Sequence, residues 1–401
     1  MLTIYNMSLE DQLEELLQET VANALERSQT AFDQLTTPFQ NSIILFGAGQ
    51  LGRKALGGLL KLGIKPLAFA DNNPQLWGEL IEGIPVLSPQ SAADKFGKVA
   101  TFAITIWRAG SSQRIGQTKQ QLLDLGCEKV ISITYLFWKY PELFLPHYCL
   151  DLPNKVLEQS DQVRQAFKLW ADKESANEYI AQLRWRLLLD FDGLPHPVNH
   201  EQYFPQDLLK ASLDEVFIDC GAYDGDTIAA LISQQGYDFK HLIALEPDPT
   251  NISKLENYKS SLGIELQERI RIVPLAASNN NGKVKFAATG NAASVISELG
   301  SLEIDCAKLD DILTNSSPTF IKMDIEGAEI DALNGAASMI RTHLPILAIC
   351  AYHQQDHLWR VPLLINSISS EYRFFLRPHG QECYDCVCYA IPHHRLRSHL
   401  N

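Results

Sequence analysis

Two glycine-rich turns, each between an apolar stretch and a helical pattern, are the first features of the sequence that point to chemistry. In the first turn, Gly47, Gly49 and Gly52 form a G-x-G-x-x-G pattern after an apolar run. Glycines there let backbone N–H groups approach a pyrophosphate, and the start of the next helix adds positive potential. Asp71 ends the next predicted strand, where a carboxylate can accept hydrogen bonds from ribose hydroxyls. The pattern predicts a nucleotide site at these four residues; the alternative is that the glycines only let strand and helix pack closely.

The residues from Asp71 onward bear on which nucleotide this segment would bind. The run Asp71-Asn72-Asn73-Pro74 and the later Trp77-Gly78 resemble the nucleotide-sugar-binding Rossmann-like domain found on bacterial sugar-modifying enzymes. No His or Tyr–Lys pair stands at an obvious spacing for hydride transfer. NAD and a nucleotide sugar therefore both stay open as ligands of this segment.

The second turn has an acid before its glycines. Its residues are Asp219, Gly221, Ala222, Tyr223 and Gly225. An acid at this point suits a ligand with positive charge, such as the sulfonium and ammonium of S-adenosylmethionine. Asp219 is expected to hold the methionine end, while Gly221 lets the backbone approach the cofactor. Glu246, which ends the next predicted strand, is placed to bind both ribose hydroxyls. The alternative is an acid that only caps the helix.

A resemblance to a known family becomes specific over about residues 200–392. Its motifs are the Asp219-Cys220-Gly221-Ala222 turn with Gly225, Leu245-Glu246-Pro247, residues 309–313, and a K-x-D-x-E-G-x-E box at residues 322–329. This ordered set resembles the FkbM family of S-adenosylmethionine-dependent methyltransferases. The resemblance implies a seven-stranded class I methyltransferase sheet with its last strand antiparallel. It also implies transfer to a hydroxyl oxygen, often on a sugar or a natural product.

Three residues are the candidates for catalysis. Asp324 and His353 end the fourth and fifth predicted strands of this half and should face the crevice where ligands of open sheets bind. His353 is the predicted general base, with a structural histidine as the alternative. Asp324 is the rival base, or orients the acceptor or the methionine ammonium. Lys322 should share the strand face of Asp324 and form an ion pair with it.

A divalent metal is an alternative ligand for the same strand ends. Asp324 and His353 resemble, in placement only, the metal site of catechol O-methyltransferases. Because the family box does not demand a metal, we assign no residue to metal binding on the basis of the sequence.

These residues need two parallel sheets to position them. The fold class expected is α/β, with two doubly wound Rossmann-like domains joined by a helical connector. The predicted parts are an N-terminal helix at 1–36, a nucleotide-binding domain at 37–150, the connector at 151–212 and the methyltransferase domain at 213–395. The N-terminal helix is expected to pack on the next domain or on another subunit, which leaves a homo-oligomer open.

Composition excludes several other classes of protein. The chain has 401 residues and a formal net charge of −14, which argues against binding to nucleic acid. Its apolar runs are far shorter than the roughly 20 residues of a membrane span. Eight cysteines, mostly unclustered, indicate free thiols in a reducing compartment. The sequence thus predicts a cytoplasmic protein.

The function predicted is O-methylation, with S-adenosylmethionine as the cofactor and a small-molecule or glycan hydroxyl as the acceptor. Two alternatives stay open at this point. One is an NAD-dependent oxidoreductase with an inactive methyltransferase-like domain. The other is a non-catalytic nucleotide-sugar-binding protein in which both sheets bind and neither reacts.

Overall fold

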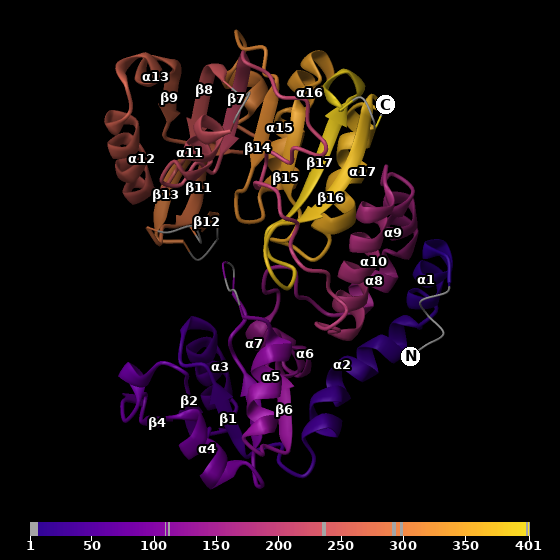
Figure 1. Ribbon diagram of the computed structural model, residues 1–401, viewed down its shortest axis with the longest axis vertical. Coiled ribbons are helices and arrows are strands. Elements are labelled where there is room, and N and C mark those ends of the chain that lie inside the picture. Colours follow the sequence, from indigo (N-terminus) through magenta and orange to yellow (C-terminus); the bar gives the residue numbers. More distant parts are fainter. Residues whose placement is uncertain are drawn as a thin grey trace. The chain divides into compact units, whose positions relative to one another are not determined.

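The chain forms two compact units of α/β structure (Figure 1). The computed structural model describes residues 7–108, 110, 113–234, 238–290, 294–296, 300–397 and 400. The first unit comprises residues 1–160, 180–196 and 380–384, and the second comprises residues 161–179, 197–379 and 385–401. Among the described residues, no helix has both the length and the apolar character that a bilayer span requires.

The first unit is built on a six-stranded sheet, counted over the described residues, with the order β3-β4-β2-β1-β5-β6. The strands are β1 (Ile43–Phe46), β2 (Ala68–Ala70), β3 (Leu80–Ile81), β4 (Ile84–Leu87), β5 (Thr101–Ile104) and β6 (Lys129–Ser132). All neighbours are parallel except the β3–β4 hairpin, which is not among the predicted strands. The helices between strands are α3 (Gln50–Lys61), α4 (Pro89–Phe96) and α5 (Ile115–Asp124).

The N-terminal segment forms two helices rather than the single one predicted. They are α1 (Leu9–Leu16) and α2 (Val21–Thr36). Thr20 starts the second helix because its side chain accepts a hydrogen bond from the Asn23 N–H, as an N-cap residue does. Further helices of the chain up to residue 188 are α6 (Thr134–Lys139), α7 (Pro141–Phe144), α8 (Asn154–Glu158), α9 (Ser160–Phe167) and α10 (Lys173–Leu188).

The second unit contains the seven strands that the sequence predicts for it, in the order β16-β17-β15-β14-β7-β8-β9 over the described residues. They are β7 (Glu215–Cys220), β8 (Phe239–Leu245), β9 (Ile270–Val273), β14 (Phe320–Met323), β15 (Ile346–Cys350), β16 (Tyr372–Pro378) and β17 (Cys386–Pro392). β17 is antiparallel to both of its neighbours, as the family resemblance implies. The prediction of an α/β fold with a class I methyltransferase sheet is therefore confirmed.

Helices connect the parallel strands of this sheet. They are α11 (Asp226–Ser233), α12 (Pro249–Ser261), α13 (Ile264–Arg269), α14 (Leu309–Ile312), α15 (Glu329–Gly335), α16 (Ala337–His343) and α17 (His357–Ile368). Phe204, in the segment before β7, packs on Phe217 and Phe320 of the sheet. The ring centroids of Phe217 and Phe320 are 4.9 Å apart. Phe204 is thus a core residue.

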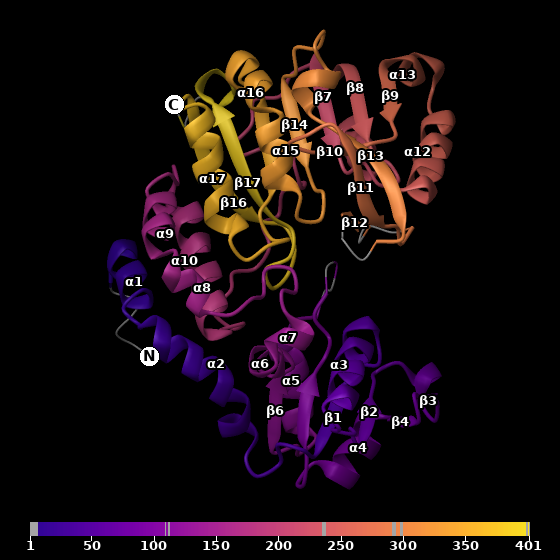
Figure 2. The ribbon, with the colours of Figure 1, turned by 180° about the vertical axis from the view of Figure 1, so that it is seen from behind.

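A second, smaller sheet in this unit was not predicted from the sequence. Its strands are β10 (Ala276–Ala277), β11 (Gly282–Ala287), β12 (Val295–Ile296) and β13 (Leu302–Ala307), in the order β10-β13-β11-β12 (Figure 2). Ala276, Phe286, Ile304 and Cys306 form its small apolar core. Because two of the strands have only two residues and β11 is mostly exposed, the sequence pattern is too short and too polar to indicate a sheet.

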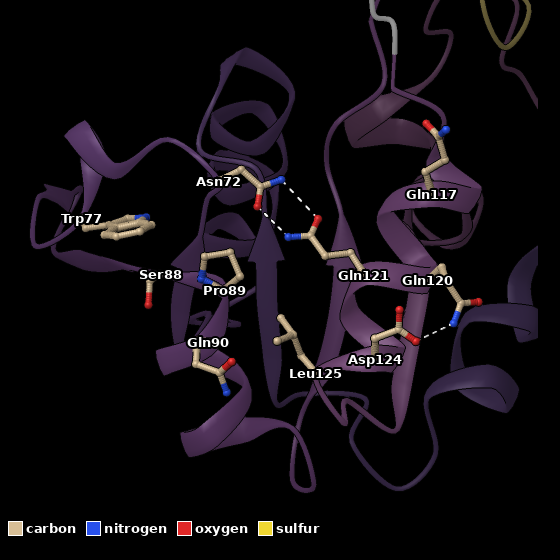
Figure 3. A pocket seen from close by; sticks show the side chains of 10 residues that line it. All are labelled: Asn72, Trp77, Ser88, Pro89, Gln90, Gln117, Gln120, Gln121, Asp124 and Leu125. Atoms are coloured by element: carbon tan, nitrogen blue, oxygen red, sulfur yellow. Dashed lines mark hydrogen bonds between the residues drawn. The ribbon is translucent and has the colours of Figure 1, made fainter.

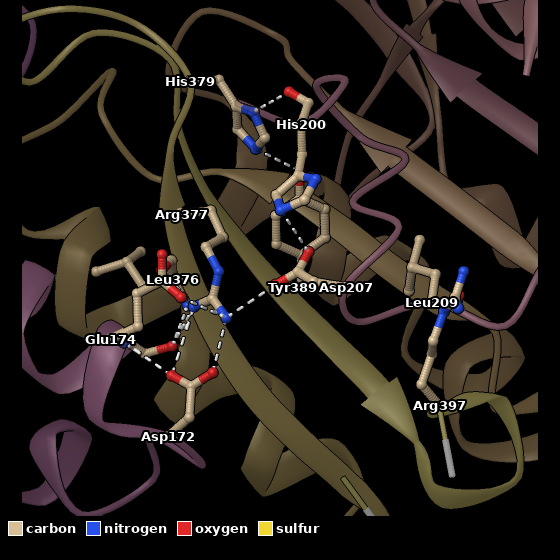
Figure 4. A network of polar contacts seen from close by, with 11 residues as sticks. Asp172, Glu174, His200, Asp207, Leu209, Leu376, Arg377, His379, Tyr389 and Arg397 are labelled. Carbon is tan, nitrogen blue, oxygen red and sulfur yellow. Dashed lines mark hydrogen bonds and ion pairs between the residues drawn. The ribbon is translucent and has the colours of Figure 1, made fainter. Parts of the chain in front are cut away.

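A buried arginine joins the chain before α10 to the large sheet (Figure 4). Arg377 of β16 is 1% exposed, and its guanidinium contacts Asp172 at 2.7 Å and Asp207 at 3.4 Å. Burial lowers the pKa of Arg377, but these carboxylates outweigh it and the net shift is upward. Breaking a buried pair of this kind typically costs about 3–5 kcal/mol, so the contact fixes residues 172–175 against β16.

Candidate functional site

The candidate site lies along the carboxyl ends of four neighbouring parallel strands. Asp219 is in β7, Glu246 follows β8, Asp324 follows β14 and His353 lies three residues beyond the end of β15. These strands are consecutive in the sheet, so their ends meet at one edge. The structure therefore brings together the four residues that the sequence predicts there.

Asp219 and Lys322 form a buried ion pair within this site. Lys322 Nζ lies 3.0 Å from Asp219 Oδ1 and donates to the Gly221 carbonyl at 2.7 Å, and both side chains are almost fully buried. Burial lowers the pKa of Lys322, but the carboxylates of Asp219 and Asp324 outweigh it and raise the net value. The ion pair expected between Lys322 and Asp324 is thus wrong. The strand register explains why Lys322 pairs with Asp219 instead of Asp324: Lys322 lies directly opposite Asp219 on the adjacent strand.

The turn after β7 contains two glycines that close neighbours and positive φ angles require. Gly221 has φ +82°, and a Cβ there would lie 2.0 Å from the Asp324 carbonyl oxygen. Gly225, at φ +95°, would meet the Tyr258 ring at 2.6 Å. Ala222 is fully buried, and its N–H donates to the Leu245 carbonyl. Glycine is therefore required at 221 and 225 by backbone conformation and by neighbours of the same unit.

Glu246 is held by two backbone N–H groups. Its Oε2 accepts from Tyr223 N and its Oε1 from Asp248 N, both at 2.9 Å. The residue is 5% exposed, and burial raises its pKa. Both carboxylate oxygens are thus fixed in direction and retain further lone pairs.

Asp324 is positioned by a tyrosine that is not among the predicted site residues. Tyr203 Oη donates to Asp324 Oδ2 at 2.7 Å, while Asp324 Oδ1 lies 3.2 Å from His353 Nε2. Burial raises the pKa of Asp324, but the hydrogen bond with His353 and the charge of Lys322 outweigh it, and the net shift is well downward. Asp324 is therefore ionised at neutral pH.

His353 lies among three carboxylates. Its Nδ1 is 2.7 Å from Glu329, and its Nε2 is 3.2 Å from Asp324 and 3.6 Å from Glu326. Burial lowers the pKa of this imidazole, but the carboxylates outweigh it and raise the net value well above the usual range. An imidazole that is already protonated cannot accept a proton from an alcohol. These surroundings do not favour the general-base role predicted for His353.

Three carboxylates of this cluster are absent from the predicted site. Burial and the neighbouring acids raise the pKa of Glu326 to about 7, although His353 opposes this. Glu329 is fully buried and also contacts His357 at 3.2 Å. Asp385, just before β17, bonds Tyr352, and burial raises its pKa to about 6. Glu326 and Glu329 belong to the K-x-D-x-E-G-x-E box, so this motif could have identified them as site residues. No sequence motif identifies Asp385.

The N-terminal turn shows three glycines in three different environments. A Cβ on Gly47 would lie 2.7 Å from the Ile106 side chain. A Cβ on Gly52 would lie 2.0 Å from the carbonyl oxygen of Gly47. A Cβ on Gly49 would meet nothing within 4 Å. Asp71 accepts from the Ala48 N–H at 2.7 Å, so its carboxylate already binds the turn.

A pocket of about 840 Å³ lies in the same unit (Figure 3). Its lining includes Asn72 and Gln121, whose side-chain amides bond each other, and the indole of Trp77. None of the four predicted nucleotide-binding residues lines it.

Comparisons with known proteins agree with this geometry. Residues 219–382 match the methyltransferase FkbM domain family. This part of the chain is therefore a methyltransferase FkbM domain. No curated protein matches the sequence.

Two solved structures are similar to the chain. The methyltransferase FkbM from Methylobacillus flagellatus KT aligns with a TM-score of 0.74 and 23% identity, over 97% of this chain and 99% of that one. At that identity the similarity shows the fold. A proposed rRNA methylase from Clostridium thermocellum aligns with a TM-score of 0.31 and 11% identity, over 45% of this chain and 88% of that one.

Proposed function

We propose that this protein is an S-adenosylmethionine-dependent methyltransferase that methylates a hydroxyl oxygen of a small-molecule or glycan acceptor. The observation that carries the proposal is the row of Asp219, Glu246, Asp324 and His353 at four adjacent strand ends. Ligands of open α/β sheets bind beyond these ends. Three carboxylates in such a row favour a ligand with positive charge over a pyrophosphate.

The residues present fit this cofactor. Glu246 offers two fixed carboxylate oxygens for ribose hydroxyls. Asp219 is fully buried, and apart from the Lys322 ammonium no donor among the described residues reaches its oxygens. It therefore has free acceptor capacity for the ammonium of the methionine end. Lys322, which holds Asp219 and the Gly221 carbonyl, acts as a positioning residue.

The acceptor is expected to lie beside Asp324. When bound, S-adenosylmethionine would supply an electrophilic methyl group: the acceptor oxygen would form the O–C bond, the C–S electron pair would stay on sulfur, and the hydroxyl proton would pass to solvent. Asp324 is ionised and fixed by Tyr203, so it can accept a hydrogen bond from the hydroxyl and orient its oxygen. The positive charge of His353 in turn holds Asp324 in place.

A nucleotide or nucleotide sugar, or NAD, is proposed for the first unit. The supporting observation is the free space at Gly49, which caps the N-terminus of α3. Gly47 and Gly52 are explained by packing, whereas the open space at position 49 leaves room for a ligand to approach the first N–H groups of α3.

The experiment that tests the proposed function is calorimetry of the full chain with S-adenosylmethionine, followed by incubation with a labelled methyl donor and a panel of nucleotide sugars, glycans and small alcohols. Wild-type protein should bind the cofactor. Glu246→Ala should bind it about tenfold or more weakly, since hydrogen bonds to charged groups contribute about 1.5–3 kcal/mol each. Glu256→Ala, which removes an exposed carboxylate of α12, is the matched control and should leave affinity unchanged. Equal affinity in both folded variants would remove Glu246 from the site.

A further inference from the structure

Asp324, Glu326 and His353 bring three potential metal ligands to one point. One ligand atom from each residue lies within 4.8 Å of the other two. His353 Nε2 is 3.2 Å from Asp324 Oδ1 and 3.6 Å from Glu326 Oε1. Ligands bound to an octahedral ion at about 2.1 Å are about 3 Å apart when adjacent, so these three atoms need to move little to share one ion.

The groups behind these ligands hold them in that orientation. Glu329, fully buried, takes the other ring nitrogen of His353 at 2.7 Å, which directs Nε2 toward Asp324 and Glu326. Tyr203 takes the far oxygen of Asp324 at 2.7 Å, which leaves Oδ1 toward the ring. A carboxylate on the second nitrogen of a histidine is the usual arrangement behind metal-bound imidazoles.

The charge of the cluster points the same way. Asp324, Glu326 and Glu329 surround the imidazole of His353, with Lys322 acting on Asp324 and His357 on Glu329, and Asp385 adds further negative charge. A divalent cation bound between these carboxylates would add two positive charges to the cluster.

We propose that Asp324, Glu326 and His353 form a binding site for a divalent cation that accepts mixed oxygen and nitrogen ligands, with Mn²⁺ as the probe. Carboxylates suit Mg²⁺ and Mn²⁺, while imidazole suits the transition ions, so Mn²⁺ meets both preferences. The site is at the strand ends where the acceptor is expected. The ion would bind the acceptor oxygen and stabilise it as its proton leaves to solvent. This catalytic meaning rests on the proposed function, whereas cation binding itself does not.

The test is Mn²⁺ titration of the chelator-treated full chain, followed by electron paramagnetic resonance and calorimetry. Wild-type protein should bind one ion per chain, with release of protons. Glu326→Gln and His353→Gln should each weaken binding tenfold or more. Glu329→Gln, which leaves the ligands but loosens the ring, should weaken it about 10–100-fold, the usual effect of such supporting groups.

Asp385→Asn is the matched control because it removes a neighbouring carboxylate that is not one of the three ligands. It should change Mn²⁺ affinity far less than Glu326→Gln does. Absence of Mn²⁺ binding by wild-type protein, or equal binding by folded Glu326→Gln, would overturn the proposal. Glu326 is partly exposed, so its variant is expected to fold even if His353→Gln does not. Calorimetry with S-adenosylmethionine on the same preparation separates this result from a failure of the proposed function.

Discussion

Asp324 is the residue beside which we propose that the acceptor lies. It receives the hydroxyl of Tyr203 on one oxygen and faces His353 with the other. Both neighbours stabilise the charged form, which explains the lowered pKa of a carboxyl that burial alone would raise. In the proposed function the roles of Glu246 and Asp324 are separate: the first is assigned to the cofactor, the second to the acceptor.

This separation predicts a split between binding and turnover. Asp324→Asn keeps the shape of the side chain but removes its charge, so kcat should fall by about 10²–10⁴, the range for loss of a group that acts on the reacting proton. Affinity for S-adenosylmethionine should stay within about threefold, because the ribose contacts at Glu246 are untouched. The methyl-transfer assay and calorimetry measure the two quantities. Full turnover in Asp324→Asn would place the acceptor elsewhere.

At the scale of elements, the turn between β1 and α3 contains glycines required for packing and one glycine that packing does not require. Gly47 and Gly52 are required by close contacts between the strand and the helix, whereas the backbone of Gly49 has an ordinary φ of −75° and open space around it. A side chain at position 49 is therefore compatible with folding.

This difference predicts that Gly49→Val folds normally and loses nucleotide binding. The valine would occupy the space next to the first N–H groups of α3, where a pyrophosphate has to approach. Gly57→Val places the same side chain in open space within α3 and is the control. Calorimetry with NAD and with nucleotide sugars measures the effect. If wild-type protein binds none of these, or if Gly49→Val binds as well as wild type, Gly49 is not part of a nucleotide site.

At the scale of the whole molecule, stability should depend on pH through a buried acid of the first unit. Glu382 is 3% exposed, and its Oε1 accepts from the Ile115 N–H at 2.6 Å. Burial raises the pKa of this carboxyl to about 7, against an ordinary value of 4.5, although the hydrogen bond and Arg114 oppose the shift. Between these two values the folded chain holds a proton that the unfolded chain has lost.

The free energy of unfolding should therefore decrease as the pH rises from about 4.5 to 7, by an amount on the order of 1–3 kcal/mol from this group. Glu382→Gln keeps the acceptor for Ile115 without the charge, so its stability should lack this decrease and exceed that of wild type at pH 8. Urea unfolding of both proteins at a series of pH values measures the difference. Parallel curves for the two proteins would show that Glu382 does not titrate in this window.

The strands of the large sheet and the residues at their ends follow from the amino-acid sequence alone. Apolar runs of four to seven residues, four of them followed by a turn and then a helical pattern, are local features, and parallel strands joined by helices bring their carboxyl ends to one edge. Asp219, Glu246, Asp324 and His353 are therefore predictable as neighbours from sequence order and strand pattern. The small sheet is not, because two of its strands have only two residues each and only one residue of β11 is buried.

The pairing of these side chains, in contrast, depends on the folded chain. Lys322 pairs with Asp219 because the register between β14 and β7 puts them opposite each other, and register is set by the packing of the whole sheet. Tyr203 reaches Asp324 across 121 positions of sequence, and no local pattern encodes such a contact. The same holds for the three carboxylates around His353. Local sequence fixes where a strand ends, but the pKa of a group and its fitness as a base or a ligand depend on neighbours that folding brings from elsewhere in the chain.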